Sequence, residues 1–435
     1  MNQHTIELDS SNQPFYLDGE LYKVREFKDI LYNKDLGNPL GVSFLFHKAE
    51  FSTINKPQII SLFNVFDDYQ CLVEIKYDYK NNKPFVREFC VKFIFPEGQV
   101  RKQYIKFVEN SNGSYSIETN KDYFGEGLLF DKPMITHIRY SSIFPLFYEE
   151  KKKIEYEIDK NEGTTTEFEF IKKLIKIDDI KILIQTFFEK ISYIGPLREQ
   201  PKDEYSISSS HKSVGTKGEF VAQILENHSQ DPIQFYKINF HEDGITYQQE
   251  EGLLLAGVKY WMCDVFGIAK DIYSERKEDS YKILLEGYSG LLTTIKHVGF
   301  GISQLLPIIV EGLRMPSNGT LILEQPEIHL HPKLQSLLFD FLYSLTLQRK
   351  TIIVETHSNH LITRMRRRVA ENMSNTMDNN INLTFIESRK GKHLFRTLNL
   401  DDFGTLDYFP KDFIEQSSSE LKAIVKAQMI KRKND

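Results

Sequence analysis

The last third of the chain alternates short apolar runs with segments of helical spacing. The runs at 320–323 and 351–354 have the length of buried strands, and apolar residues at helical spacing follow each of them. Pro332 suits the first turn of a helix, where its missing N–H costs nothing, and Ser358 can cap the next helix. Strand–helix–strand–helix at this spacing predicts an α/β fold, with a mostly parallel sheet and flanking helices.

The first third of the chain has a different pattern, rich in Val, Ile, Phe and Tyr. The runs 69–79 and 85–95 flank a turn signal at 80–83, and two shorter runs follow at 103–108 and 114–118. This pattern predicts an antiparallel β subdomain beside the α/β part.

Four regions follow from these patterns. Residues 1–148 are expected to form the antiparallel β-rich part, and 149–298 a helical and loop insertion with connecting strands. Residues 299–375 are expected to form the α/β core and 376–435 a small C-terminal domain. The charge-rich stretch 149–165 is expected to be an exposed connector.

Composition excludes several classes of protein. The net charge of −6 argues against a protein that binds nucleic acid over most of its surface, but it allows a local basic patch. Cys71, Cys90 and Cys263 are too few and too scattered for a disulfide framework or a CxxC metal site. No apolar run reaches the ~18 residues of a membrane span, and no export signal is visible, so a cytoplasmic protein without a membrane partner is expected.

Polar clusters follow both apolar runs of the α/β part, where parallel sheets place their chemistry. Glu324 ends the first run, and a carboxylate held there can order the Mg²⁺ shell beside the phosphates of a nucleotide. The alternative is an acid that merely ends a strand. His357 follows the second run and can hydrogen-bond a γ-phosphate, or it can have a structural role.

A glycine-rich turn precedes the predicted helix at 302–313. Gly299 and Gly301 leave backbone N–H groups free to meet an anion at the helix start, and Ser303 adds a hydroxyl donor. The alternative is a tight turn with no ligand.

The order of these three clusters resembles the second half of an ABC-type ATPase head of the RecF, SMC and OLD-like AAA ATPases. Residues 298–313 are similar to the signature segment of these proteins, 320–335 to their Walker B and D-loop segment, and 351–365 to their switch-histidine segment. Residues 193–201 and 214–225 resemble motifs of one subgroup, which ends in a small C-terminal domain of unknown function.

The resemblance implies a P-loop NTPase-like fold, with ATP and Mg²⁺ as cofactors and a homo- or heterodimer of heads around the nucleotide. It implies one set of residues around the metal and the attacking water, and a second set that contacts the nucleotide or the partner head. The first set is Glu324 (the Mg²⁺ ligand), Gln325, Glu327 and His357; the second is Gly299, Gly301, Ser303, Gln304 and Arg198.

Two departures from the family pattern bear on activity. No GxxxxGK[ST] phosphate loop is present, and residues 16–35 resemble what normally follows it, so the chain is expected to lack the N-terminal Walker A segment. Gln325 stands where the family has the catalytic glutamate, and an amide cannot accept a proton as a carboxylate does. Glu327 is a candidate substitute, and whether the chain hydrolyses ATP stays open.

Two further clusters leave alternatives open. His329 and His331 have the look of a metal pair, but they also match the D-loop of the family. The arginines at 364 and 366–368 form either a solvated helix face or a contact to a phosphate backbone.

Three functions remain after this comparison. The first is an ATPase subunit whose nucleotide-driven dimerisation controls a partner, such as a separate effector protein in anti-phage defence, or nucleic acid. The second is a nucleotide-free scaffold or interaction protein that keeps the fold. The third is a nuclease of the OLD type, although Glu387, Asp401 and Asp402 form no convincing acid triad on strands.

Overall fold

The chain divides into two compact units, Met1–Glu189 and Lys190–Asp435. The computed structural model describes most of the second unit and separate strands of the first, together with one helix. The described residues are 40–47, 70–80, 83–94, 103–111, 115–119, 135–136, 138–141, 144–147, 153–158, 161–166, 177–207, 211–241, 244–372, 381–389 and 392–408.

The first unit contains a six-stranded antiparallel sheet in which each strand pairs with the next along the chain. Val73, Ile75, Phe89 and Phe107 are fully buried, because alternate side chains of these strands point to one covered face. The predicted β meander is therefore confirmed. Its strands are β1 (Leu40–His47), β2 (Gln70–Lys80), β3 (Lys83–Ile94), β4 (Gln103–Glu109), β5 (Tyr115–Thr119) and β6 (Ile135–Thr136).

The charge-rich stretch at 149–165 is not a plain connector. It contains most of an antiparallel hairpin, β9 (Lys153–Ile158) with β10 (Asn161–Thr166). Alternating Ile, Tyr and Ile in β9 and consecutive threonines in β10 favour strands despite the charges between them. The unit also holds the pair β7 (Ile138–Ser141) and β8 (Phe144–Phe147) and the helix α3 (Ile177–Glu189).

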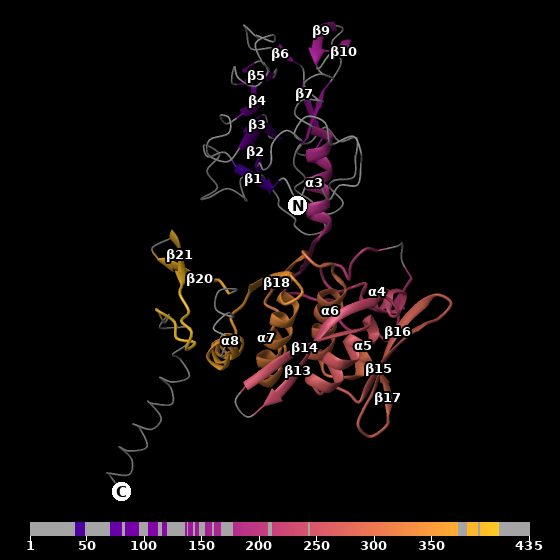
Figure 1. The fold of residues 1–435 in the computed structure, drawn as a ribbon. Coiled ribbons are helices and arrows are strands. Elements are labelled where there is room, and N and C mark those ends of the chain that lie inside the picture. The colour runs from indigo at the N-terminus through magenta and orange to yellow at the C-terminus, as the bar shows by residue number, and fades with distance from the viewer. Residues whose placement is uncertain are drawn as a thin grey trace. The chain divides into compact units, whose positions relative to one another are not determined.

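The second unit contains three parallel strands in the order β11–β18–β19. Three helices, α6, α7 and α8, follow or separate these strands along the chain (Figure 1). The bounds are β11 (Ile191–Ile194), β18 (Thr320–Glu324), β19 (Thr351–Glu355), α6 (Phe300–Arg314), α7 (Pro332–Thr346) and α8 (Asn359–Glu371).

The predicted helix starts in this part are confirmed. Pro332 is the first residue of α7, and the His331 side chain accepts a hydrogen bond from the Lys333 N–H. The Ser358 side chain accepts from the Leu361 N–H at the start of α8. Each cap satisfies a backbone donor that the first helical turn leaves without a partner.

Antiparallel strands and short helices complete the unit. The sequence predicts a mostly parallel sheet, and this prediction is wrong for the described residues as a whole. Only β11, β18 and β19 pair in parallel, and the other described pairs are antiparallel. The remaining elements are β12 (Tyr205–Ser206), α4 (Val221–His228), β13 (Pro232–His241), β14 (Gly244–Leu253), α5 (Leu254–Lys259), a π-helix (Tyr260–Val265), β15 (Asp271–Arg276), β16 (Ser280–Glu286), β17 (Leu292–Thr294), a 3₁₀ turn (Ile295–His297), β20 (Leu383–Arg389) and β21 (Lys392–Leu398).

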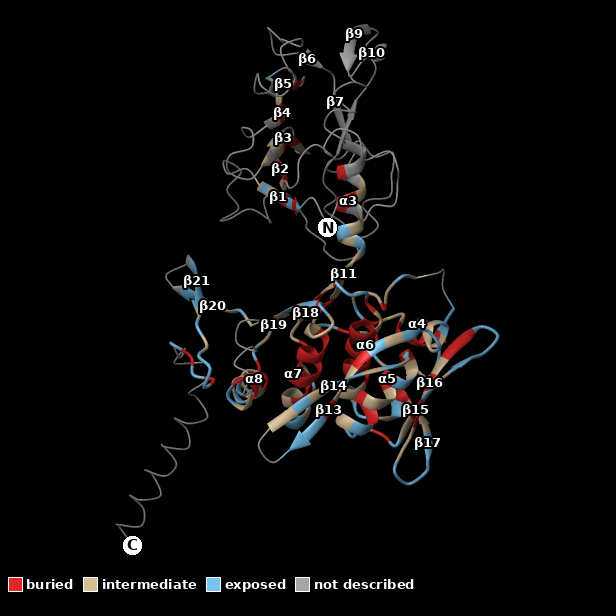
Figure 2. Cartoon of the chain, in the orientation of Figure 1, coloured by how far each residue is buried: buried red, intermediate tan, exposed pale blue. Residues whose placement is uncertain are grey.

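The hydrophobic core of this unit surrounds α6 and α7, which are the most deeply buried helices in Figure 2. Trp261 is fully buried and stands edge-on to Phe341 of α7, with ring centroids 5.0 Å apart. The segment that carries this single tryptophan therefore packs against the α/β core.

The two faces of the parallel sheet differ. Leu321 and Leu323 of β18 point to the buried face. Ile353 of β19 lies on the other face and is 52% exposed. Ile353 and Glu355 are two positions apart in β19 and share a face, so the face that carries the strand-end carboxylates is the more open one.

Candidate functional site

The carboxyl ends of β18 and β19 bring two acidic side chains together. Glu324 and Glu355 are the last residues of their strands, and the parallel register pairs them directly. Adjacent positions in a parallel ladder put both side chains on the same face of the sheet. We call this pair the acid edge.

Tyr193 of β11 lies on the same side of the sheet as the acid edge. Burial raises the pKa of Tyr193 to about 12, and the nearby carboxylates of Glu324 and Glu355 act in the same direction. A negative charge on this phenol is therefore strongly disfavoured, and Tyr193 stays a neutral hydrogen-bond donor beside Glu324.

Gln325 follows the strand in an unusual conformation. Its φ of 44° lies in the left-handed region, which a residue with a side chain seldom adopts. Its backbone N–H donates to the Glu355 carbonyl over 2.8 Å, so the turn after β18 is tied to the end of β19. The structure thus fixes the backbone at Gln325, which is predicted from the sequence to lie near the attacking water.

Glu327 is buried in the turn after β18, and it has a contact that the sequence does not reveal. Its Oε1 accepts a hydrogen bond from the His357 N–H over 2.7 Å. Its Oε2 is buried and has no partner among the described residues. Glu327 therefore links the segments after both strands.

The His357 side chain is exposed just beyond β19, and no hydrogen bond to its imidazole is found within the described ranges. It is accessible to a ligand that approaches the acid edge. Glu327 holds the backbone N–H of His357, so the position of the His357 backbone, from which the imidazole extends, is fixed.

The glycine turn before α6 has one open and one packed glycine. Gly299 is exposed, and a Cβ built on it meets no atom within 4 Å. A Cβ on Gly301 would lie 2.4 Å from the His329 carbonyl oxygen, so only glycine allows α6 to approach the turn after β18 this closely.

Ser303 and Gln304 are buried in α6. The Gln304 Nε2 donates to the Glu199 carbonyl over 3.3 Å, which engages this amide within its own chain. Gly299 is therefore the accessible member of the predicted nucleotide-contacting set in α6 and its turn.

Arg198 packs against the turn after β18. Its Nη2 donates to the carbonyls of Glu324 and Gln325, each over 3.4 Å. The side chain is 6% exposed, and its Nε and Nη1 have no partner in the described part of the chain. Burial lowers the pKa of Arg198 to about 10, against an opposing effect of Glu327, so it remains charged at neutral pH.

An open pocket of about 570 Å³ adjoins Arg198. Four basic side chains and two acidic ones line it. The residues of this basic pocket are Leu197, Arg198, Glu199, Gln200, Pro201, Lys202, Asp203, Lys217 and Lys296. Both sequence segments that resemble subgroup motifs, 193–201 and 214–225, contribute to it.

A magnesium ion fits the acid edge by its chemistry. Mg²⁺ is commonly bound through one or two carboxylates, with phosphate oxygens and waters as its other ligands. The paired carboxylates of Glu324 and Glu355 supply that number. In the described ranges no group of three or more His, Cys, Asp or Glu residues could hold a metal by itself.

His329 and His331, which follow the acid edge in the sequence, have different structural roles. His331 Nδ1 accepts from the Lys333 N–H over 3.3 Å as the cap of α7. His329 has a φ of 64° in the turn before it. These features favour the structural alternative over a metal pair.

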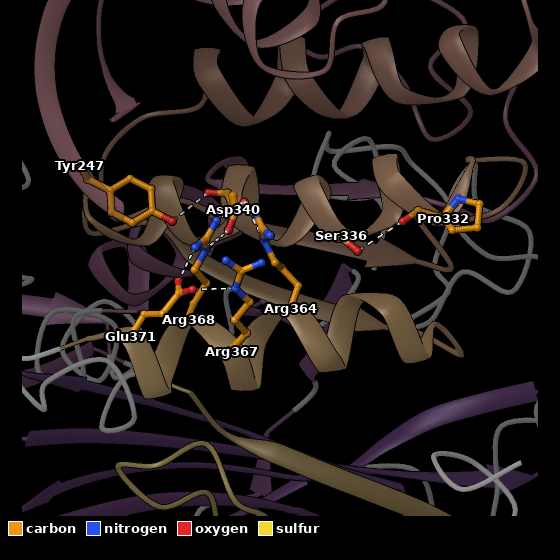
Figure 3. A network of polar contacts seen from close by, with 8 residues as sticks. All are labelled: Tyr247, Pro332, Ser336, Asp340, Arg364, Arg367, Arg368 and Glu371. Carbon is orange, nitrogen blue, oxygen red and sulfur yellow. Dashed lines mark hydrogen bonds and ion pairs between the residues drawn. The ribbon is translucent and has the colours of Figure 1, made fainter. Parts of the chain in front are cut away.

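Three of the four arginines of α8 are held by acids of their own unit, and the fourth, Arg366, donates to the Gly404 carbonyl. Arg364 and Arg368 both contact the fully buried Asp340 of α7, with closest distances of 2.6 Å and 2.8 Å, and Glu371 binds Arg367 and Arg368 (Figure 3). We call these five residues the arginine cluster. Because its charges are paired, the contact to a phosphate backbone loses its support.

The acids considered for a nuclease belong to no group of metal-binding side chains within the described residues. Asp401 Oδ1 accepts from the backbone N–H groups of Phe403 and Thr405, which is the arrangement of a turn. Glu387 lies in β20, on a separate two-stranded sheet.

The family model described as "AAA domain, putative AbiEii toxin, Type IV TA system" matches residues 78–363, more than half of the chain. The protein therefore belongs to this AAA family, whose domains have the α/β fold of P-loop NTPases and bind nucleotide. This confirms the predicted resemblance at the level of AAA ATPases, while the RecF, SMC and OLD-like subgroup stays a prediction. No curated protein matches the chain.

None of the helices described in this structure is long and apolar enough to cross a membrane.

Proposed function

We propose that this chain is the ATP-binding head of an ABC-type ATPase, in which Mg²⁺–ATP closes two heads and thereby controls a partner protein or nucleic acid. The observation that carries the proposal is the acid edge, where Glu324 and Glu355 pair at the ends of two parallel strands. Membership of a nucleotide-binding AAA family supports the same conclusion.

Each described residue of the site has a proposed role. Glu324, assisted by Glu355, would hold Mg²⁺, which when bound neutralises phosphate charge. His357 is exposed beyond β19 and would donate to a phosphate oxygen. The exposed turn at Gly299 would face the nucleotide of the second head.

The 435 residues contain no GxxxxGK[ST] segment, so the proposal gives this chain only part of the phosphate contacts. A site that lacks the backbone cradle of a phosphate loop binds ATP weakly on its own. The proposed head therefore acts in a composite site, to which this chain contributes the acid edge and the Gly299 turn.

Slow hydrolysis is part of the proposal. Gln325 cannot accept a proton from water, and Glu327 already uses one oxygen to hold the His357 backbone. Binding of nucleotide, rather than rapid turnover, would then set the state of the head.

The test is a calorimetric titration of the purified chain with ATP at millimolar concentration, once with Mg²⁺ and once with EDTA. We expect Mg²⁺ to strengthen ATP binding in the native chain and Glu324→Gln to remove that advantage. Glu278→Gln, an exposed acid on the β15–β16 turn, is the matched control and should keep it. An Mg²⁺ advantage that survives in Glu324→Gln would contradict the assignment of the metal to the acid edge.

A nucleotide-free scaffold is the second candidate. It is favoured by the internal use of Gln304 and Glu327, both of which hold the fold together. Under this alternative no ATP binds at millimolar concentration, with or without Mg²⁺, and the same titration separates the two functions.

A further inference from the structure

The basic pocket carries more positive charge than its own acids neutralise. Lys202 pairs with Glu199 over 2.6 Å, and Lys296 pairs with Asp203 over 2.5 Å. Both acids of the pocket are engaged by these pairs. Arg198 and Lys217 are the two remaining cations, and neither forms an ion pair within the described residues, although Glu327 is near enough to favour the charge on Arg198.

Arg198 is the unusual member of the pair. A guanidinium that is 94% removed from solvent normally has hydrogen-bond acceptors for its nitrogen atoms, because an unsatisfied buried donor costs free energy. Here Nη2 reaches two carbonyls, while Nε and Nη1 reach no acceptor. The missing acceptors are what an anion in the adjoining pocket would supply.

The loops around the pocket are fixed before any ligand arrives. The Gly195 N–H donates to Thr216 and the Glu199 N–H to Lys217, each over 2.8 Å. At Gly218, with a φ of 74°, a Cβ would lie 2.4 Å from Pro307 of α6, so the loop that carries Lys217 is seated closely on that helix. The backbone that carries the donors is therefore ordered before binding, and only the side chains have to adjust.

The basic pocket also contacts both segments of the candidate nucleotide site. Arg198 holds the carbonyls at the end of β18, and Glu199 accepts from Gln304 of α6. A ligand that drew the Arg198 guanidinium into the pocket would therefore act on the backbone that carries Glu324.

We propose that the basic pocket is a separate anion site that binds a phosphate group, with Arg198 and Lys217 as its charged donors. Guanidinium and ammonium groups form strong charge-assisted hydrogen bonds with phosphate oxygens. The phosphate can belong to a nucleotide or to a single-stranded nucleic acid, which share this chemistry. The site does not require that Glu324 bind a metal.

The test uses the full chain in EDTA, so that a metal at the acid edge plays no part. Inorganic pyrophosphate is titrated by calorimetry, and ATP and a short single-stranded DNA are titrated in parallel. We expect saturable binding of at least one probe, weakened about tenfold by Lys217→Gln, because a charge-assisted hydrogen bond is lost. Arg198→Gln should weaken it at least as much.

Lys277→Gln is the control, since this exposed lysine lies on the β15–β16 turn and does not line the pocket. Lys217 is exposed, so Lys217→Gln should fold normally. Its effect on binding therefore tests the proposal even if Arg198→Gln fails to fold. Weakened binding of DNA alone assigns the phosphate to nucleic acid, and weakened binding of ATP and pyrophosphate assigns it to a nucleotide. The proposal is overturned if no probe binds saturably, or if Lys217→Gln and Lys277→Gln bind equally well.

Discussion

Two buried arginine sites in the unit Lys190–Asp435 show how differently the same side chain can be accommodated. In the arginine cluster, Arg368 is 2% exposed and its guanidinium lies against the carboxylates of Asp340 and Glu371. Arg198 is 6% exposed, and two of its three nitrogen atoms meet no acceptor in the described residues. The paired site has its acceptors within the fold, whereas the unpaired one lines an open pocket.

This difference separates a structural charge from a functional one. A buried ion pair that is complete joins two helices and offers nothing to a ligand. A buried cation with open donors beside a pocket is costly to keep unless something binds there. The comparison predicts opposite consequences for mutations at the two sites.

The largest effect is expected from Asp340→Asn. This fully buried acid contacts both Arg364 and Arg368, and its neutralisation leaves two cations without their common partner. We expect the free energy of unfolding to fall by about 4 kcal/mol, measured by urea denaturation. Asp279→Asn, at an exposed position on the β15–β16 turn, should change it little, and equal effects of the two would refute the paired account.

A buried lysine extends the comparison to pH. Lys350 Nζ donates to the carbonyls of Gly312 and Leu313, and burial lowers the pKa of Lys350 from its usual 10.5 to about 7, against an opposing effect of Glu311. Between these values the unfolded chain binds one more proton than the folded chain, so stability rises with pH.

We expect Lys350 to contribute a gain of about 3 kcal/mol in the free energy of unfolding between pH 7 and about pH 10. Lys350→Met should flatten this part of the profile, as measured by urea denaturation at several pH values. If the native chain and the variant follow parallel profiles, Lys350 is not the group that titrates.

The smallest effect on stability is expected at the unpaired site. Arg198→Met removes a buried charge that no ion pair holds and that only the longer-range effect of Glu327 favours, so the free energy of unfolding should stay within about 1 kcal/mol of the native value. Thermal or urea unfolding measures this directly. A loss as large as that of Asp340→Asn would mean that Arg198 is as fully used by the fold as the arginine cluster is.

The sequence predicts the elements whose signals are local. The Pro332 helix start and the Ser358 cap depend on residues within a few positions of each other, and the structure bears them out. The parallel pairing of β18 and β19 follows from the strand–helix–strand spacing and is also borne out. The hairpin at 153–166 is missed because charge masks its strand pattern.

The state of each site residue is harder to predict, because it depends on partners distant in the sequence. Asp340 neutralises arginines 24 and 28 positions away, and Glu327 binds a backbone N–H 30 positions away. The sequence singles out Arg198 by resemblance alone. That its nitrogen atoms lack acceptors follows only from the three-dimensional packing. Glu355, which completes the acid edge, is detectable as the register partner of Glu324 once both strands are assigned.

The central claim is that the acid edge holds a divalent cation together with a nucleotide. Mn²⁺ can replace Mg²⁺ as a spectroscopic probe, and its electron paramagnetic resonance spectrum in the presence of ATP reports whether the complex is immobilised by protein. The account predicts an immobilised Mn²⁺–ATP signal with the native chain that is lost in Glu324→Gln. A spectrum that the native chain leaves unchanged at millimolar ATP would contradict it.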